Sequence, residues 1–429
     1  MNRSPKEKQR ENYRWWIVAA SFIMVFTCLG FCSTTKSLYL AAITEALSLE
    51  RGLFSINDSI RFLTTAALNL FFGTLVARFG PRKLVTAGFC SLIASVLVYS
   101  VAENIFVFYI GGALLGMGLA WTTTTMVGYM INAWCREHKG TIMGAVLAAN
   151  GLGGALAAQI VSPIIYGSED GFGYRTAYRV TALILLSVGL IVCLIYRDKA
   201  ADGQIAAVAE KKARGESWSG LSFEEAIHRR FFYVAAVCVF ATGMALQSIG
   251  GISSAHFRDV GFDAGFVATV VSVHAIILAA FKFLTGICYD RIGLAKTMLI
   301  CSAAAVVMAL LLAFAHTGSS GRVMAFAYAF FSSMALPLET VMLPLITGEL
   351  FGRKSYAKLM GVLVSVNTFG YAVGAPLSNA CFDLTGSYKS IILIQGGLMV
   401  LIAVTFQFVI RAARRVRREI EEQSAAEAE

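Results

Sequence analysis

The residues in this chain that are best suited to chemistry are charged side chains inside long apolar segments. Lys282 lies in the run from His274 to Lys296, Lys36 and Arg61 lie in two earlier runs, and Glu339 lies in a later one. A charge within a membrane-length apolar helix costs at least a few kcal/mol, so it faces protein, water or a ligand. Basic groups in such places bind anions through charge-assisted hydrogen bonds, and a carboxyl group there can exchange a proton.

Lys36 and Arg61 also have structural explanations. Lys36 lies in a polar patch between Ser33 and Tyr39, which predicts a hydrated face, although a lysine can also extend to the outer headgroups. Arg61 shares one helix face with Asn57 and with two threonines at helical spacing. Asp58 lies three residues before Arg61, so an ion pair between them is an alternative to a ligand-binding role.

Two residues are candidates for proton coupling. His274 titrates near neutral pH, which suits proton exchange, but a packed uncharged histidine explains it equally well. Glu339 lies between Pro337 and Pro344 and can accept a proton or neutralise Lys282. Proline kinks also expose backbone groups that need polar partners, so a structural role for Glu339 stays open.

Further polar side chains on the predicted helices are candidate substrate ligands. Thr125 ends a run of four threonines, which either line a cavity or hydrogen-bond backbone carbonyls. Asn367 and Tyr371 lie one turn apart on a late apolar segment. The predicted substrate-binding set combines these with the cations and their neighbours: Lys36, Tyr39, Asn57, Arg61, Thr125, Lys282, Asn367 and Tyr371.

The composition indicates a membrane protein. Of the 429 residues, 57% are hydrophobic and only 14% are charged, with a mean hydropathy of +0.69, whereas a soluble chain has about 25% charged residues. Apolar runs bounded by charges or turn formers predict about twelve membrane-spanning helices. Their expected ranges are 15–40, 54–77, 83–102, 105–133, 140–166, 176–196, 230–253, 264–288, 294–316, 322–350, 356–382 and 389–411. The N-terminus is more polar than a signal peptide, so the first helix is expected to stay in the membrane.

The expected fold is an all-α membrane protein with two six-helix bundles. About 27 Lys and Arg residues fall in the tails and loops on the side of the N-terminus, against about 6 on the other side, which predicts that both termini are cytoplasmic. The expected segments are a tail (1–14), the N-terminal bundle (15–196), a linker (197–229), the C-terminal bundle (230–411) and a second tail (412–429). The expected location is a bacterial cytoplasmic membrane.

Several classes of function are disfavoured. The nine cysteines show no metal-ligand or disulfide spacing, so no metal and no cofactor is expected. The net charge of +10 follows membrane topology, so no nucleic-acid partner is expected. No nucleotide-binding loop and no catalytic motif is present, which argues against ATP-driven transport and against an enzyme. The expected partners are a small organic anion, protons or a counter-anion, and membrane lipid, with the chain acting as a monomer.

The two halves of the chain are related by an internal repeat. The segment from Gly73 to Leu84 recurs from Gly286 to Thr297 at an offset of about 213 residues, pairing Gly80 with Gly293. A second pair of segments recurs at an offset of about 217 residues, pairing Arg136 with Arg353 and Asn150 with Asn367. We therefore expect two parallel copies of one structural unit.

The repeated loop resembles that of the major facilitator superfamily, with the pattern G-x-x-x-D-R-x-G-R-R/K. The second copy keeps Gly286, Asp290, Arg291 and Gly293, whereas the first copy has Ala77 in place of the acid. The resemblance covers nearly the whole chain and implies a twelve-helix transporter fold. It also implies that the loop residues gate the cytoplasmic side, and here the candidates are Arg78, Arg82, Asp290 and Arg291.

A finer resemblance is to the monocarboxylate transporter and oxalate/formate antiporter branch. It rests on Lys36 with its neighbours, on Lys282 four residues before Gly286, and on the segment from Gly374 to Tyr388. In that branch a lysine of helix one and a basic residue of helix eight serve carboxylate transport. This chain departs by having lysine in helix eight, and Leu278 where an aspartate often stands one turn earlier.

The residues and the resemblance together predict a secondary transporter that moves a small organic anion, most simply a monocarboxylate, by alternating access with proton symport or anion exchange. One alternative is an efflux carrier for larger amphipathic organic acids or drugs, which the 12% aromatic content favours. A nontransporting sensor is a further alternative, although the central linker is short for an additional domain.

Overall fold

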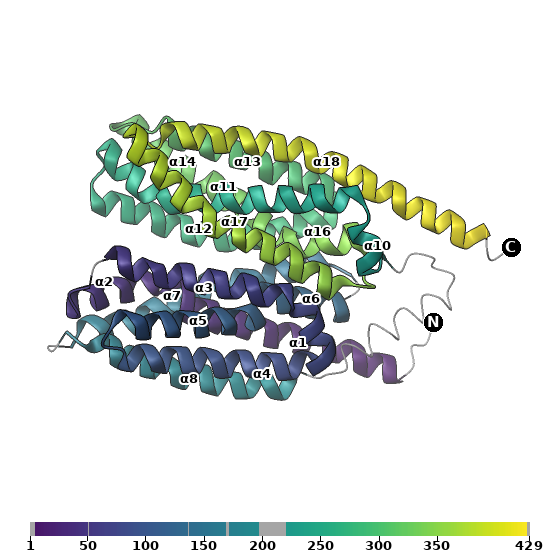
Figure 1. The fold of residues 1–429 in the computed structure, drawn as a ribbon, viewed down its shortest axis with the longest axis horizontal. Helices are drawn as coiled ribbons and strands as arrows, with labels where there is room; N and C mark the ends of the chain where they lie inside the picture. Colours follow the sequence, from purple (N-terminus) through teal and green to yellow (C-terminus); the bar gives the residue numbers. More distant parts are fainter. Residues whose placement is uncertain (1–4, 50, 136, 169–170, 197–219, 427–429) are drawn as a thin grey trace. The chain divides into compact units, whose positions relative to one another are not determined.

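The computed structural model describes residues 5–49, 51–135, 137–168, 171–196 and 220–426. The described residues are almost entirely helical, which confirms the all-α expectation (Figure 1). Within the described residues, Gly220 and Gly352 form an isolated antiparallel β-bridge. The chain forms two compact units, Met1–Gly203 and Gln204–Glu429. Residues 197–219, which make up most of the predicted linker, lie outside the described residues, and so does Arg136.

The first unit is a bundle whose helices follow one another through short connections. Its elements are α1 (Pro5–Leu29), the π-helical segment η1 (Gly30–Thr34), α2 (Lys36–Ala46), α3 (Arg51–Leu70), α4 (Phe72–Val101), α5 (Ile105–Thr122), α6 (Thr124–Trp134), α7 (Lys139–Tyr166) and α8 (Gly173–Ile195).

The second unit has the same order of long helices after a short surface helix. Its elements are α10 (Phe223–Ile227), α11 (Arg230–Val260), α12 (Ala264–Ile292), α13 (Leu294–Ala313), α14 (Ser319–Ala335), α15 (Pro337–Thr340), α16 (Met342–Phe351), α17 (Tyr356–Thr385) and α18 (Lys389–Ala426).

Eleven segments of the described chain are long and apolar enough to cross a membrane. The predicted second helix is not among them, because Asn57, Asp58 and Arg61 lower the hydropathy of α3. Helix α3 instead has two faces. Its exposed stripe includes Ile56 and Leu63, whereas Arg61, on the opposite face, is buried in the first unit.

The packing of the helices repeats between the units as the sequence predicted. In the first unit α7 packs against α1 and η1, and α4 packs against α5 and α8. In the second unit α17 packs against α11, and α13 packs against α14 and α18. These are the same pairs of positions in the two halves, so the repeat in the sequence is a repeat in the fold.

The repeated loop has nearly the same backbone in both copies. Gly80 has φ 79° and ψ 159°, and Gly293 has φ 80° and ψ 172°. A positive φ strains any residue with a Cβ atom, so glycine is required at both places. Gly80 therefore breaks the helix between the predicted segments 54–77 and 83–102, and Pro81 then starts the next helix as a favourable first residue.

Several predicted helices differ from the structure in their limits, among them the first, which is divided into α1, η1 and α2. The segment expected as 322–350 is divided into α14, α15 and α16, because Pro337 lacks the N–H that would continue the helical hydrogen bonds. The helix expected to end at residue 411 continues as α18 to Ala426, and Figure 1 shows its yellow end extending beyond the other helices of its unit. No glycine or proline interrupts the sequence there, so the apolar helix passes directly into a charged one.

Helix α10 begins with a side-chain cap at the end of the linker. The hydroxyl of Ser222 accepts from the backbone N–H of Glu225, and the Glu225 carboxylate accepts from the backbone N–H of Ser222. Such a reciprocal cap satisfies two N–H groups that the helix itself leaves unpaired. Glu225 also forms an exposed ion pair with Lys354 at 3.5 Å, and the backbone N–H of Leu221 donates to the carbonyl of Phe351. The linker end is thereby attached to the loop before α17.

The cap of α10 should weaken in acid. The pKa of Glu225 lies below its usual value because the carboxylate accepts the hydrogen bond from the Ser222 backbone, with Lys354 adding a smaller effect. A lowered pKa stabilises the folded cap above the unfolded value of about 4.3, and this contribution is lost as pH falls through the folded pKa. Hydrogen exchange of amides 222–225, corrected for intrinsic rates, should lose protection below about pH 4. The neutral variant Glu225→Gln should lack this step, and identical profiles for the two proteins would contradict the assignment.

Candidate anion-binding site

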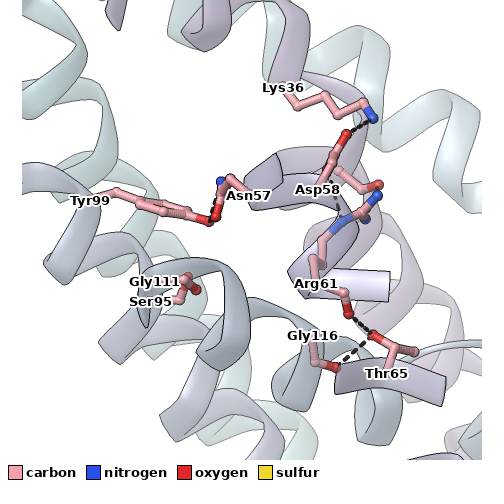
Figure 2. A network of polar contacts seen from close by, with 10 residues as sticks. Lys36, Asn57, Asp58, Arg61, Thr65, Ser95, Tyr99, Gly111 and Gly116 are labelled. Atoms are coloured by element: carbon pink, nitrogen blue, oxygen red, sulfur yellow. Dashed lines mark hydrogen bonds and ion pairs between the residues drawn. The ribbon is translucent and has the colours of Figure 1, made fainter. Parts of the chain in front are cut away.

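Lys36, Asp58 and Arg61 of the first unit form one connected network (Figure 2). The Nζ of Lys36 donates to Oδ2 of Asp58, and the Nε of Arg61 lies 3.0 Å from Oδ1 of the same carboxylate. The Nη1 of Arg61 donates to the Ser33 hydroxyl at 3.2 Å. One carboxylate is therefore shared by two cations, and the network has a net charge of +1.

The three charges differ in their access to the surroundings. The side chain of Arg61 is 8% exposed, whereas Asp58 is 37% exposed and Lys36 is 52% exposed. A guanidinium group buried this deeply needs a compensating negative charge, and Asp58 supplies it. Lys36 and Asp58 form the accessible edge of the network, and Arg61 forms its buried end.

The position of Lys36 follows from the interruption of the first membrane helix. The π-helical segment η1 ends immediately before Lys36, and π-type turns are frequent at functional positions because they redirect the next residues. The Thr34 hydroxyl donates to the carbonyl of Leu29 and to Oδ1 of Asn150 on α7. A Cβ atom on Gly154 would lie 2.4 Å from the side chain of Thr34, so this contact requires glycine.

Glycines of α5 set the position of Arg61. A Cβ atom on Gly112 would lie 2.0 Å from Oδ1 of Asn57, and one on Gly116 would lie 2.4 Å from the carbonyl oxygen of Arg61. Helices α3 and α5 thus approach along a small-residue spacing of four, as membrane helices commonly do. The Thr65 hydroxyl contacts the carbonyls of both Arg61 and Gly116 at 2.9 Å, which holds the two helices in register (Figure 2).

Aromatic side chains pack behind the charged network. The ring of Tyr178 stacks on Tyr39 with centroids 4.0 Å apart and contacts Tyr99 at 5.3 Å. The side-chain amide of Asn57 donates to the Tyr99 hydroxyl at 2.9 Å. Tyr39 and Asn57, both predicted substrate ligands, are therefore joined to the network through this cluster. Tyr99 and Tyr178 had no signal in the sequence, because they lie on α4 and α8 and reach the cluster only through the fold.

The second unit has a buried cation and a buried acid. Lys282 on α12 and Glu339 on α15 are each 6% exposed and are near enough to interact electrostatically. The described residues include no direct ion pair between them. Oε2 of Glu339 is buried without a hydrogen-bond partner among the described residues, while Tyr371 lies beside the carboxyl group. The role of Glu339, either in accepting a proton or in neutralising Lys282, stays a prediction.

His274 is held by backbone and hydroxyl groups of α14. Its Nδ1 lies 3.2 Å from the carbonyl of Ala329 and 3.0 Å from the Ser333 hydroxyl. These contacts match the packed histidine that the sequence left as an alternative, and the role of His274 in proton coupling stays a prediction.

Two other predicted ligands take part in helix packing. The Thr125 hydroxyl donates to Oδ1 of Asn69 at 3.0 Å, and the amide of Asn367 donates to the carbonyl of Val239 at 3.1 Å. The hydroxyls of Thr122 and Thr123 donate to carbonyls one turn earlier, as expected for threonines in membrane helices. Substrate binding by Thr125 and Asn367 therefore stays a prediction.

The predicted gating residues lie at the two loop copies. Arg78, Arg82 and Arg291 are exposed, and Asp290 is half-buried at the end of α12. The guanidinium of Arg78 lies 5.4 Å from the ring of Phe79. Their gating role stays a prediction from the resemblance.

An apolar groove on the second unit is a poor place for an anion. It has a volume of about 300 Å³ and lies between α11 and α18, with Tyr233, Val237 and Leu401 among its lining residues. The lining residues carry no charge, whereas an anion needs donors or cations to replace its hydration.

The repeated bundles and the intramembrane charges define a membrane transporter. The sequence profile of the Major Facilitator Superfamily matches residues 15–252 and 235–429, and the chain belongs to this superfamily. It is a multi-pass membrane protein of a transporter family, and not an enzyme.

Proteins similar in sequence to this chain are named for different functions. The chain is 25% identical to an uncharacterized MFS-type transporter, YcxA, of Bacillus subtilis (strain 168), over 62% of this chain and 60% of that protein. It is 23% identical to monocarboxylate transporter 13 of Rattus norvegicus, over 90% of this chain and 86% of the other. It is 25% identical to the multidrug resistance protein MdtG of Enterobacter lignolyticus (strain SCF1), over 84% and 82%.

Solved structures agree with the fold. A structure of the proton:xylose symporter XylE, bound to 6-bromo-6-deoxy-D-glucose, superposes with a TM-score of 0.75 at 14% identity, and the match covers 94% of this chain and 96% of that one. At this identity the likeness establishes the fold alone.

Replacing Gly116 should disturb the network without removing any of its charges. Gly116→Ala places a methyl group against the Arg61 carbonyl and should destabilise the protein by about 1–3 kcal/mol, because overpacking forces the helices apart. The matched control is Gly250→Ala on α11, where nothing lies within 4 Å of the new Cβ atom. Thermal unfolding in detergent should show a lower midpoint for Gly116→Ala and an unchanged or higher one for Gly250→Ala. Equal midpoints would argue against the close contact.

Proposed function

We propose that this protein is a secondary transporter of small organic anions, most simply monocarboxylates, in a bacterial cytoplasmic membrane. The observation that carries the proposal is the pairing of a buried arginine with an accessible lysine around a single carboxylate in the first unit. Arg61 retains donor nitrogens beyond those used by Asp58 and Ser33 in the described part of the chain, and Lys36 is half-exposed. Such cations bind a carboxylate by charge and by hydrogen bonds together.

The second unit contributes Lys282 to the same proposed task. Lys282 forms no direct ion pair with Glu339 among the described residues, and an anion that approaches the ammonium group lowers the cost of its charge within the helix. We propose that binding of an anion to such a basic group favours the conformational change of alternating access, since a ligand shifts an equilibrium only through differential affinity. Arg78, Arg82, Asp290 and Arg291 would then gate the cytoplasmic side. The protein acts as a monomer in this scheme, with both termini cytoplasmic.

One relative supports the choice of cargo, and another supports a second candidate. The match to monocarboxylate transporter 13 extends over most of both chains, and it agrees with the basic residues of α2 and α12. The match to MdtG, named for multidrug resistance, favours efflux of larger amphipathic organic acids or drugs. The aromatic cluster of Tyr39, Tyr99 and Tyr178 gives that second candidate an apolar surface beside the charges.

Uptake of labelled lactate into proteoliposomes tests the proposal. Arg61→Ala and Lys282→Ala should each lower uptake at least about tenfold, because a hydrogen bond between charged groups contributes about 1.5–3 kcal/mol. Arg415→Ala, which removes an exposed arginine of α18, is the matched control and should leave uptake unchanged.

Folding of each variant is checked by its thermal unfolding midpoint. Normal lactate uptake by both Arg61→Ala and Lys282→Ala would reject anion binding by these cations. If the unmodified protein exports a fluorescent amphipathic acid but does not take up lactate, the efflux carrier is favoured.

A further inference from the structure

We propose that Asp58 is the proton-coupling group of this transporter and that its carboxylate acts as a built-in competitor for the substrate anion. The inference rests on the proposed function and adds to it the group that links proton and anion. It differs from the sequence-based expectation, which placed proton coupling on His274 and Glu339.

The geometry makes Asp58 a stand-in for a bound carboxylate. Its two oxygens are each taken by a different cation, Oδ2 by Lys36 and Oδ1 by Arg61 (Figure 2). A substrate carboxylate that binds both cations must therefore replace Asp58. Replacement is unfavourable while Asp58 is ionised, because two carboxylates would share one site. Protonation of Asp58 removes this repulsion and releases both cations for the anion.

The charge of the network explains why proton and anion would move together. With Asp58 ionised and no substrate, the network has a charge of +1. With Asp58 protonated and a monocarboxylate bound, the charge is again +1, because one positive and one negative charge have been added. Binding of the anion alone gives 0 and of the proton alone gives +2. The empty and fully loaded states are thus electrostatically alike, and the two half-loaded states differ from them, which favours symport of one proton per monocarboxylate.

The surroundings leave Asp58 as the suitable acid in the first unit. The titratable groups that face it are Lys36 on α2, Arg61 on its own helix and Tyr99 on α4, with Cys32 of η1 beside Arg61. Helix α5, which packs against α3, has no Asp, Glu, Lys, Arg or His. Among the residues of this unit whose side chains the structure describes, the other carboxyl groups are exposed near helix ends: Glu45, Glu103 and Glu137.

Access to Asp58 also fits a proton carrier. Its side chain is 37% exposed, and that of Lys36 is 52% exposed, so a proton and an anion can reach the same edge of the network. Charged groups that are accessible within a membrane-spanning bundle face water or protein instead of lipid. Arg61 stays buried behind them and keeps the carboxylate in place when the substrate is absent.

The test compares the unmodified protein with Asp58→Asn, which mimics the protonated acid, in proteoliposomes with labelled lactate. We expect Asp58→Asn to exchange internal for external lactate at equal pH within about threefold of the normal rate. An inward proton gradient should no longer drive accumulation of lactate by this variant. Its exchange should also vary little between pH 5 and pH 8, whereas exchange by the unmodified protein should fall as pH rises. Asp383→Asn, an exposed aspartate near the end of α17, is the matched control and should keep gradient-driven accumulation.

The outcomes separate this inference from the proposed function. Gradient-driven accumulation by Asp58→Asn at the normal level would overturn the role of Asp58 and point to Glu339, while lactate transport itself would stand. Loss of exchange in a variant with a normal thermal unfolding midpoint would also overturn it, because a neutral side chain should leave the cations able to bind. Absence of lactate transport by the unmodified protein would reject the proposed function and this inference together.

Discussion

The structure of the first unit depends on the cost of holding the Arg61 guanidinium inside a membrane bundle. Burying an ion in a low-dielectric interior costs several kcal/mol, and removing its ion-pair partner leaves the buried charge uncompensated. Asp58 supplies the opposite charge from the same helix, one turn away, and Lys36 is attracted to the carboxylate from the preceding helix. The contacts of these three groups, with that of Arg61 to Ser33, join η1, α2 and α3.

Close backbone approach is the second requirement of the site. Helix α5 presents Gly112 and Gly116 to α3, and α7 presents Gly154 to Thr34 of η1. At these contacts α3 and η1 pack directly against the backbone of the neighbouring helix, because glycine has no side chain. In a membrane the hydrophobic effect does not drive helices together, and close packing with interhelical hydrogen bonds takes its place. The glycines therefore decide how near the charged side chains lie to one another, although they carry no charge themselves.

The two units share their architecture but differ in their charges. Gly80 and Gly293 have nearly the same backbone angles, and Asn150 and Asn367 both hydrogen-bond across equivalent helix pairs. The first unit concentrates its charges in an accessible triad, whereas Lys282 and Glu339 of the second unit are buried without a direct ion pair among the described residues. In the branch that the chain resembles, an acid often precedes the basic residue of helix eight. Here that position is Leu278, and the acid paired with a membrane arginine is found on α3.

The sequence by itself determined the fold class, the repeat and the break at Gly80, because hydropathy and glycine conformation act over a few neighbouring residues. It also identified the charged residues, since an ionised side chain in an apolar run is conspicuous wherever it points. The tertiary structure alone decided which of them meet. Whether Lys36 extends to the headgroups or reaches Asp58, and whether Tyr99 and Tyr178 lie beside Tyr39, depends on helix rotation and on the distance between helices. Those are set by side chains and glycines far apart in the chain, and no local pattern contains that information.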